Sequence, residues 1–308
     1  MMEESFSTPI LLLIFNRPTA VEKVIQNLRA IQPAKVYVGA DGPRPNKPDD
    51  SAKCAQARDI LKNIDWSCEI ITLFREKNMG CRNAVHEAID WFFEHEESGI
   101  ILEDDCVPDV SFFPFATELL ERYKESPQVM HIAGDNPIED LTHSLPESYT
   151  FVSMPLVWGW ATWRRAWRKI NLSLEGLEDF DFKQLSLDSL SQKYLAEKFE
   201  ATQKEENDSW AYAWYYSILQ NKGICILPKV NLVRNIGFNE ESTHTTTSNK
   251  IRELKSQKVP FPLTHPESIK VSHEIEQQLF YAAQKTKMGL LGRFWLPKWL
   301  RLFFGAKK

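Results

Sequence analysis

Apolar, strand-like runs alternate with helical patterns along the first 105 residues of the chain. The runs span residues 9–15, 36–40, 69–74 and 100–102, and the helical patterns span 21–28, 54–64 and the stretch that begins at 79–80. Strands that alternate with helices in this way are joined by crossovers and form parallel sheets. The sequence therefore predicts an α/β fold with a mostly parallel sheet flanked by helices.

The pattern changes after residue 105. We expect helices over 112–125 and 210–219, strands over 129–134 and 224–227, and a polar, mostly helical stretch over 174–209. Residues 235–249 are rich in Asn, Ser, Thr and His, a composition that is typical of a long mobile loop. We interpret this part as an extension of the α/β domain that starts near residue 150.

Three adjacent acids, Glu103, Asp104 and Asp105, follow the fourth apolar run. They are expected where a buried strand leaves the sheet, which is where open α/β sheets bind their ligands. Adjacent carboxylates repel one another, so the cluster favours a bound cation. Hard oxygen ligands suit Mg²⁺ or Mn²⁺, which also hold the phosphates of substrates. The run predicts a metal–diphosphate site, and an acidic, solvated turn is the alternative.

The composition restricts the classes of function. The chain has 308 residues and a net charge of −5, which is ordinary for a globular protein and offers no basic stripe for broad nucleic-acid binding. Five widely spaced cysteines without a C-x-x-C pair argue against a disulfide framework or a zinc site. The first residues carry no basic signal-type segment. We therefore expect a cytoplasmic protein without a nucleic-acid partner.

Residues 288–308 combine aromatic side chains with Lys and Arg, and no acidic residue follows Glu276. This composition is typical of a segment that lies on an anionic membrane surface, although Pro297 would kink or break a helix there. The sequence thus predicts peripheral contact with the inner face of a membrane. A segment docked on its own domain, or in an oligomer, is the alternative.

Five segments carry a resemblance to a known family: residues 12–17, 39–42, 75–80, 103–105 and 207–210. In this order they resemble motifs of GT-A fold nucleotide-sugar glycosyltransferases. The most similar family is that of the Golgi N-acetylglucosaminyltransferase that starts complex N-glycans, together with its bacterial relatives. The resemblance extends over residues 9–247. It implies a Rossmann-like GT-A sheet with an acceptor-side extension.

The resemblance assigns roles at the donor nucleotide. It places Arg17 at the nucleotide, Asp41 on a uracil base and Asp104 near the ribose, and it makes Asp105 the ligand of Mn²⁺ or Mg²⁺. Arg75 belongs to the segment that covers the base, at a position where the family has His. A nucleoside-diphosphate sugar, UDP-linked in this family, is the implied donor.

The resemblance also implies a catalytic base, Asp208, which would deprotonate the acceptor hydroxyl. Of the family's Trp-Asp-Asp-Trp segment, only Asp208 and Trp210 are retained. A single base opposite the leaving group implies one displacement with inversion. The alternative for Asp208 is a helix N-cap, because an aromatic helix follows.

Further residues are candidates for substrate contacts: Glu103, Asp135, Asn136, Trp158, Gly159, Trp160, Trp210, Arg234 and His244. Each has a simpler structural alternative. The aromatic block 158–167 is typical of a core, Asp135 and Asn136 of a turn, and a lone His in a polar loop of a solvated side chain. Arg17 and Asp41 are likewise typical of a helix start and a turn.

We thus expect three regions: a nucleotide-sugar-binding half (1–150), an acceptor-side half of the same catalytic domain (151–250), and a helical, basic and aromatic tail (251–308). The predicted function is metal-dependent, inverting glycosyl transfer from a nucleotide sugar, such as UDP-N-acetylglucosamine, to a glycan or lipid-linked acceptor of a bacterial surface polysaccharide. A sugar nucleotidyltransferase is one alternative, but residues 16–19 are a poor substitute for its Gly-rich, basic loop. A non-catalytic glycan-binding or scaffold protein on the same fold is the other.

Overall fold

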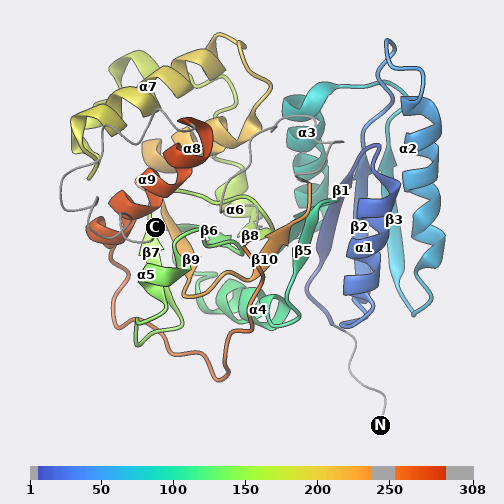
Figure 1. Cartoon of the computed structure of the whole chain (residues 1–308), viewed down its shortest axis with the longest axis horizontal. Coiled ribbons are helices and arrows are strands. Elements are labelled where there is room, and N and C mark those ends of the chain that lie inside the picture. Colours follow the sequence, from blue (N-terminus) through green and yellow to red (C-terminus); the bar gives the residue numbers. More distant parts are fainter. Residues whose placement is uncertain (1–5, 238–253, 289–308) are drawn as a thin grey trace, which may run out of the picture.

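The computed structural model describes residues 6–237 and 254–288. Its centre is an eight-stranded sheet, shown in Figure 1. The strand order is β3 (Glu69–Phe74), β2 (Lys35–Ala40), β1 (Ile10–Ile14), β4 (Ser98–Glu103), β8 (Trp160–Trp163), β6 (Val129–Ala133), β9 (Ile224–Pro228) and β7 (Tyr149–Val152). The first four strands are parallel, and so are β6 and β9, whereas β8 and β7 run antiparallel to their neighbours. This largely parallel sheet confirms the predicted fold class.

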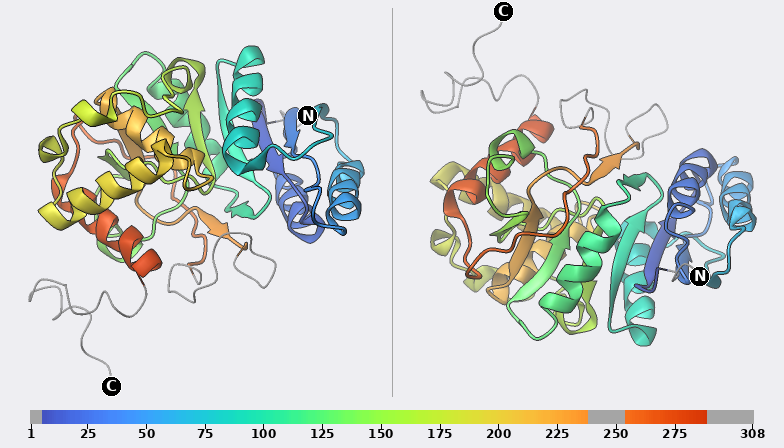
Figure 2. Two further views of the ribbon diagram at one scale, coloured as in Figure 1. Left: turned by 90° about the horizontal axis from the view of Figure 1, so that it is seen from above. Right: turned by 90° about the horizontal axis from the view of Figure 1, so that it is seen from below.

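Helices pack on both faces of the sheet. One face is covered by α1 (Pro18–Leu28), α2 (Asp50–Asp59) with the 3-10 helix η1 (Ile60–Asn63), and α4 (Phe112–Arg122). The other face is covered by α3 (Gly80–His95), α6 (Arg164–Trp167), α8 (Trp210–Gln220) and α9 (His273–Met288). In both views of Figure 2, α1 and α2 lie at one end of the molecule and the later helices at the other.

Smaller elements complete the described part. The helix α7 (Ser189–Gln203) packs on α8 together with the 3-10 turns η2 (Leu177–Asp179) and η3 (Phe182–Gln184). A short helix, α5 (Glu139–Thr142), follows β6. Away from the main sheet, β5 (Cys106–Pro108) and β10 (Val233–Asn235) form an antiparallel pair. This pair brings residue 235 beside residue 106, at the end of the acidic run.

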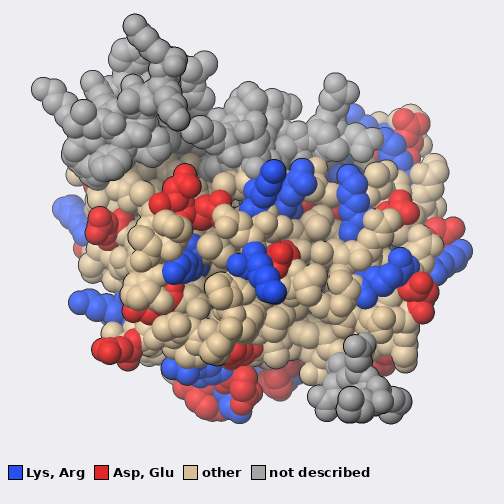
Figure 3. Space-filling model, turned by 60° about the horizontal axis from the view of Figure 1, so that its bottom comes forward, with Lys and Arg blue, Asp and Glu red and all other residues tan. Residues whose placement is uncertain are grey.

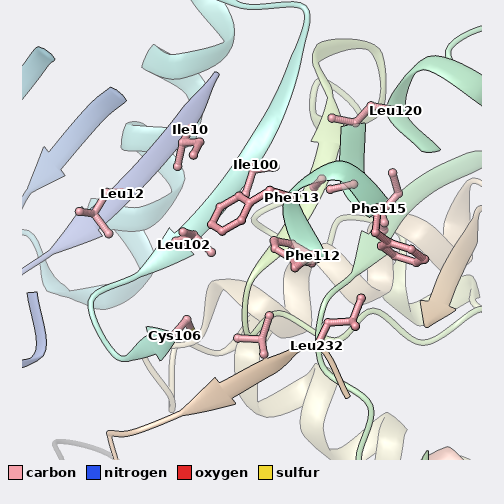
Figure 4. Close-up of a cluster of buried hydrophobic side chains, with 14 of the residues drawn as sticks. Ile10, Leu12, Ile100, Leu102, Cys106, Phe112, Phe113, Phe115, Leu120 and Leu232 are labelled. Carbon is pink, nitrogen blue, oxygen red and sulfur yellow. The ribbon is translucent and has the colours of Figure 1, made fainter. Parts of the chain in front are cut away.

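Strand β1 is apolar throughout because both of its faces are buried. Ile10, Leu12 and Ile14 belong to the core under α1 and α4, while Leu11 and Leu13 belong to the core under α3. Figure 4 shows the first of these cores, where Phe113 of α4 lies beside Ile100 and near Leu102 of β4. A strand that is buried on both faces has no polar side, as expected for the interior of a parallel sheet.

The observed elements follow the predictions closely up to residue 105 and less closely afterwards. The expected strands and helices over 9–105 are all present, with the helix over 54–64 beginning earlier and ending in the 3-10 turn η1. The expectation of a mostly helical 174–209 is wrong for 174–188, which forms short 3-10 turns before α7 begins. In the expected tail, residues 254–272 form no helix, and α9 is helical only from His273. Residues 289–308 lie outside the described part.

One face of the described part is mixed in charge. On the face shown in Figure 3, basic and acidic side chains are interspersed among uncharged ones. None of the helices within 6–237 and 254–288 is both long and apolar enough to cross a membrane.

Candidate functional site

A cavity opens where β1, β2, β3 and β4 end. Because these strands are parallel, their carboxyl ends meet at one edge of the sheet, and the polar residues that follow each strand are brought together there. The cavity measures about 350 Å³, within the range of small-molecule sites. Seven of the predicted site residues line it: Arg17, Asp41, Arg75, Glu103, Asp104, Asp105 and Trp158.

An arginine bridges two of the three acids at the end of β4. The Arg17 guanidinium donates from Nη1 to Asp105 Oδ2 over 2.8 Å, and its Nη2 forms a short ion pair with Asp104 Oδ1. The other Asp104 oxygen accepts from the Phe15 backbone N–H at 3.3 Å. Pro18 at the start of α1 fixes the turn that carries Arg17. The charges of Asp104 and Asp105 raise the pKa of Arg17, although burial opposes the shift.

The acid cluster carries more carboxylates than Arg17 neutralises. Burial, together with the charges of Asp105 and Asp104, raises the pKa of Glu103 to about 8. Burial also raises the pKa of Asp104 to about 6, against the opposing effect of Arg17. Both acids therefore hold protons more tightly than usual in the absence of a further cation. Such a cluster gains from a bound cation.

The β5–β10 pair closes one wall of the cavity. It positions Ile236, whose N–H donates to the Asp105 carbonyl at 2.8 Å. The next residue, Gly237, passes so close that a Cβ atom there would lie 2.1 Å from Asp105 Oδ2 and 2.9 Å from Arg17 Nη1. A side chain at this position would therefore force the ion pair to shift. The sequence analysis missed both short strands, because three-residue runs show no periodicity.

A second polar cluster surrounds Asp41 at the end of β2. Asp41 is 8% exposed, and its carboxylate accepts from the backbone N–H groups of Gly42 (2.8 Å) and Met79 (2.9 Å). The Asn78 amide donates to Asp41 Oδ2 over 2.8 Å and to the Gly42 carbonyl over 3.0 Å. Burial raises the pKa of Asp41, although the backbone hydrogen bonds and Arg75 oppose the shift. Asp41 therefore binds the 75–79 segment to the end of β2.

Two further arginines line the cavity near this cluster. Arg44 donates to Asp50 from Nε (2.6 Å) and Nη2 (3.0 Å), and its guanidinium lies over the Phe15 ring at 5.3 Å. Arg75 pairs with Glu87 at 3.1 Å. The sequence analysis did not single out Arg44, Asn78 or Cys81, which also line the cavity. Their position within eight residues of a strand end was the available signal.

Asp208 lies at the start of α3. Its carboxylate accepts from the backbone N–H of Cys81 (2.6 Å) and of Arg82 (2.9 Å), which are two of the four unpaired donors in the first turn of that helix. Gly80, with φ of +78°, allows this approach, because a Cβ there would lie 3.1 Å from Asp208 Oδ2. These contacts are those of a helix cap, for α3 and not for the aromatic helix α8. Asp208 does not itself line the cavity, although its neighbour Cys81 does.

Several predicted aromatic contacts lie in the core. Trp160 and Trp210 are 1% and 3% exposed, and their rings stack at 5.7 Å. The Trp160 ring also stacks on that of buried His131 at 4.9 Å. Gly159 has φ of +66° and packs on Val233. Of the predicted aromatic residues in the block 158–167, Trp158 is the one that lines the cavity.

The remaining candidates lie apart from the cavity. Asn136 is fully buried, and its amide binds Thr142 (2.8 Å) and the Pro228 carbonyl (2.7 Å), which is the turn-forming alternative. Asp135 is also buried, and its Oδ1 atom has no hydrogen-bond partner among the described residues. Burial raises the pKa of Asp135 to about 7. Arg234 is exposed on β10, and His244 lies outside the described residues.

The donor set at the acid cluster fits a divalent metal ion. Asp104 and Asp105 supply hard carboxylate oxygens, and the space beside Asp105 is kept free of side chains by Gly237. Within the described ranges, no group of three or more His, Cys, Asp or Glu side chains is arranged to hold a metal. An ion here would therefore take few protein ligands and complete its shell with phosphate and water, as Mg²⁺ commonly does.

Comparisons with known proteins place nucleotide-sugar enzymes among the structural neighbours. No protein-family model matches the chain, and no curated protein does. One similar solved structure is the mannosyltransferase PcManGT from Pyrobaculum calidifontis in complex with GDP-Man and Mn²⁺, with 13% identity, a TM-score of 0.37, and coverage of 63% of this chain and 52% of that chain. This chain thus spans about half the length of that enzyme.

Two other neighbours have different activities. Mouse xyloside xylosyltransferase 1 shows 13% identity and a TM-score of 0.33, with 70% of this chain and 82% of that chain covered. A UDP-glucose pyrophosphorylase complexed with UDP-glucose shows 8% identity and a TM-score of 0.38, with 72% and 90% covered. Similarity at this level does not distinguish sugar transfer from nucleotidyl transfer.

Proposed function

We propose that the chain is a metal-dependent glycosyltransferase that uses a nucleoside-diphosphate sugar as donor. The observation that carries the proposal is the division of one cavity into two polar ends. The acid cluster with Arg17 lies at the end of β4, and the Asp41–Asn78 cluster lies at the end of β2. Since β1 alone separates these strands, the two ends are about 10 Å apart. A diphosphate with its cation suits the first end, and a nucleobase suits the second.

The residues of the chain divide the work accordingly. Asp105 and Asp104 would hold the cation, and Arg17, which pairs with both of them, is near enough to bind a phosphate oxygen. A bound divalent cation would neutralise the charge that develops on the leaving diphosphate. Trp158, at the cavity wall, is available to contact the sugar. The base that activates the acceptor hydroxyl stays a prediction for Asp208, and with it the inverting course.

The finer assignments rest on the sequence. A UDP-sugar donor, a glycan or lipid-linked acceptor in bacterial surface polysaccharide synthesis, and contact of residues 288–308 with the inner face of a membrane follow from the resemblance and from the tail composition. For the membrane contact, a chain ending at residue 287 should no longer sediment with anionic vesicles. If the shortened chain still sediments, the tail is not the anchor.

The proposal is tested by calorimetric titration with UDP, GDP, ADP and CDP, each with and without Mn²⁺. We expect at least one nucleotide to bind only with Mn²⁺, and Asp105→Ala to abolish this binding. Asp59→Ala is the matched control, because it removes the same charge from a side chain that is 69% exposed on α2. Binding that survives in Asp105→Ala would remove the metal site from the proposal.

The products that the protein releases distinguish the alternative activities. A sugar nucleotidyltransferase would release pyrophosphate from a nucleoside triphosphate and a sugar phosphate, whereas a glycosyltransferase consumes the nucleotide sugar and releases the diphosphate. Failure to bind any nucleotide, with or without Mn²⁺, would contradict both activities and favour a glycan-binding or scaffold role.

A further inference from the structure

The polar cluster at the end of β2 fixes the orientation of one amide. Asn78 faces two acceptors, Asp41 Oδ2 at 2.8 Å and the Gly42 carbonyl at 3.0 Å. Acceptors require donors, so the NH₂ end of the Asn78 amide must point toward them. Both amide hydrogens are thereby used. The Oδ1 atom is directed away from this pair of bonds, and it has no hydrogen-bond donor among the described residues.

The segment that carries Asn78 is held rigidly. The Met79 N–H donates to Asp41, and the Lys77 backbone packs on Gly42 so closely that a Cβ there would lie 2.4 Å from the Lys77 carbonyl carbon. The Arg75 N–H also donates to the Ala40 carbonyl at 3.0 Å. Because the backbone on both sides of Asn78 is tied to the end of β2, its amide keeps one position. Asn78 lines the cavity, so this position bears on any ligand there.

We propose that Asn78 Oδ1 selects the nucleobase of the donor, by accepting a hydrogen bond from a ring N–H. Uracil and thymine carry such a hydrogen at N3 and guanine carries one at N1, whereas cytosine N3 and adenine N1 are acceptors that would face Asn78 Oδ1 unpaired. Two facing acceptors without a hydrogen are unfavourable when water is excluded. The inference rests on the proposed function and names the base class that this site takes.

This assignment changes the role of Asp41. The resemblance implies that Asp41 contacts the base, but both carboxylate oxygens already accept hydrogen bonds from Gly42, Met79 or Asn78. Asp41 is here a positioning residue that sets which end of the Asn78 amide faces the cavity. Asp41→Asn allows that amide to turn over and should weaken the base preference.

The test is the ratio of dissociation constants of UDP and CDP, measured by calorimetry with Mn²⁺ in the wild-type chain, in Asn78→Ala and in Asn83→Ala. Asn83→Ala is the matched control, because it removes the same side chain from an exposed position of α3 outside the cavity. If guanine is the natural base, GDP and ADP are the corresponding pair. We expect the base with a ring N–H to bind about tenfold or more tightly to the wild type and to Asn83→Ala. In Asn78→Ala the preference should fall to about threefold or less, and Asp41→Asn should lower it as well.

A probe on the ligand side keeps the test independent of protein folding. UDP methylated at N3 lacks the ring hydrogen and should bind the wild type no better than CDP does; N1-methyl-GDP serves in the same way for guanine. A wild-type chain that binds both members of a pair equally, or an Asn78→Ala variant that retains the full preference, would overturn the inference and leave the proposed function standing. Absence of any nucleotide binding would overturn both.

Discussion

At the scale of single residues, the stability of the metal-free chain depends on the ion pairs that Arg17 forms with Asp104 and Asp105. The side chain of Asp104 is 3% exposed and that of Arg17 is 20% exposed, so this pair is largely removed from water. Arg17→Ala leaves the buried carboxylates without their cationic partner, and removing one member of a buried ion pair is costly. We expect the free energy of unfolding to fall by about 3 kcal/mol, measured by urea denaturation without metal.

The same variant should respond more strongly to Mn²⁺. In Arg17→Ala no cationic side chain of the described residues pairs with Asp104 or Asp105, so added Mn²⁺ should raise the melting temperature by more than in the wild type. Arg168→Ala provides the control, because Arg168 is exposed on the surface. An equal Mn²⁺ response in all three proteins would show that the ion does not bind at the Arg17 pair.

Asp135 makes stability depend on pH. Burial raises the pKa of Asp135 from its usual 3.8 to about 7, so between these values the folded chain keeps a proton that the unfolded chain has lost. The contribution of Asp135 to the free energy of unfolding therefore falls as the pH rises from about 4 to about 7 and is constant above that range. Three pKa units correspond to at most about 4 kcal/mol. In thermal scans, the melting temperature of Asp135→Asn should exceed that of the wild type by more at pH 8 than at pH 5. A difference that is the same at both pH values would contradict an ionisation of Asp135.

Sequence reasoning found the charged end of the cavity and missed much of the other end. The acids Glu103, Asp104 and Asp105 were predictable because they directly follow a buried strand. Polar residues at the carboxyl end of such a strand lie at the edge where parallel sheets bind ligands. Asn78 was not, because its importance comes from the Gly42 carbonyl and Asp41, which lie 36 and 37 positions away. Hydrogen bonds between distant segments leave no local pattern.

At the scale of elements, the start of α3 decides between two roles for Asp208. As a cap it accepts the Cys81 and Arg82 N–H groups, so Asp208→Ala should lower the free energy of unfolding by about 1–2 kcal/mol. As the catalytic base it should in addition lower the rate of sugar transfer about 100-fold or more, and Asp208→Asn should do the same at little cost in stability. Denaturation and turnover are measured on the same samples.

The chain provides a second capped helix for comparison. Asp188 caps α7 by accepting from the Leu190 (2.9 Å) and Ser191 (3.1 Å) N–H groups, away from the cavity. Asp188→Ala should lose at least as much stability, because Asp188 also accepts from the Tyr281 hydroxyl at 2.7 Å, and it should keep its turnover. If Asp208→Asn transfers sugar at the wild-type rate, Asp208 is a cap only, and the base lies elsewhere.

Elements were predictable where they repeat a long pattern. Strands β1 to β4 and helices α1 and α3 have several apolar residues each at strand or helix spacing, and the predictions for them agree with the structure. The strands β5 and β10 have three residues each and form because they pair with one another. Their pairing is set by tertiary contacts, and it delivers Gly237 to the acid cluster.

At the scale of the whole molecule, strand order joins the two halves expected from the sequence. Strand β8, which follows residue 150, lies between β4 and β6, which both precede it, and β9 lies between β6 and β7. The sequence predicted β6 and β9 but neither β7, β8 nor this strand order, because pairing between distant strands leaves no pattern in the sequence of either strand. The predicted boundary at residue 150 therefore falls within one continuous sheet.

This interleaving predicts that the first 150 residues do not fold by themselves. Without β8 and β9, strand β6 has no partner and β4 becomes an exposed edge with buried Ile100 and Ile101 uncovered. The fragment 1–150 should lack a cooperative urea transition, whereas the full chain should unfold in one transition with the same midpoint by tryptophan fluorescence and by far-ultraviolet circular dichroism.

The fluorescence reports on both halves of the chain, because tryptophans lie at 66 and 91 in the first half and at 158 and beyond in the second. A saturating nucleotide with Mn²⁺ should move that whole transition to higher urea, since its cavity is lined from both halves. Two separate transitions, of which only the first shifts with nucleotide, would instead make residues 1–150 an independent nucleotide-binding domain.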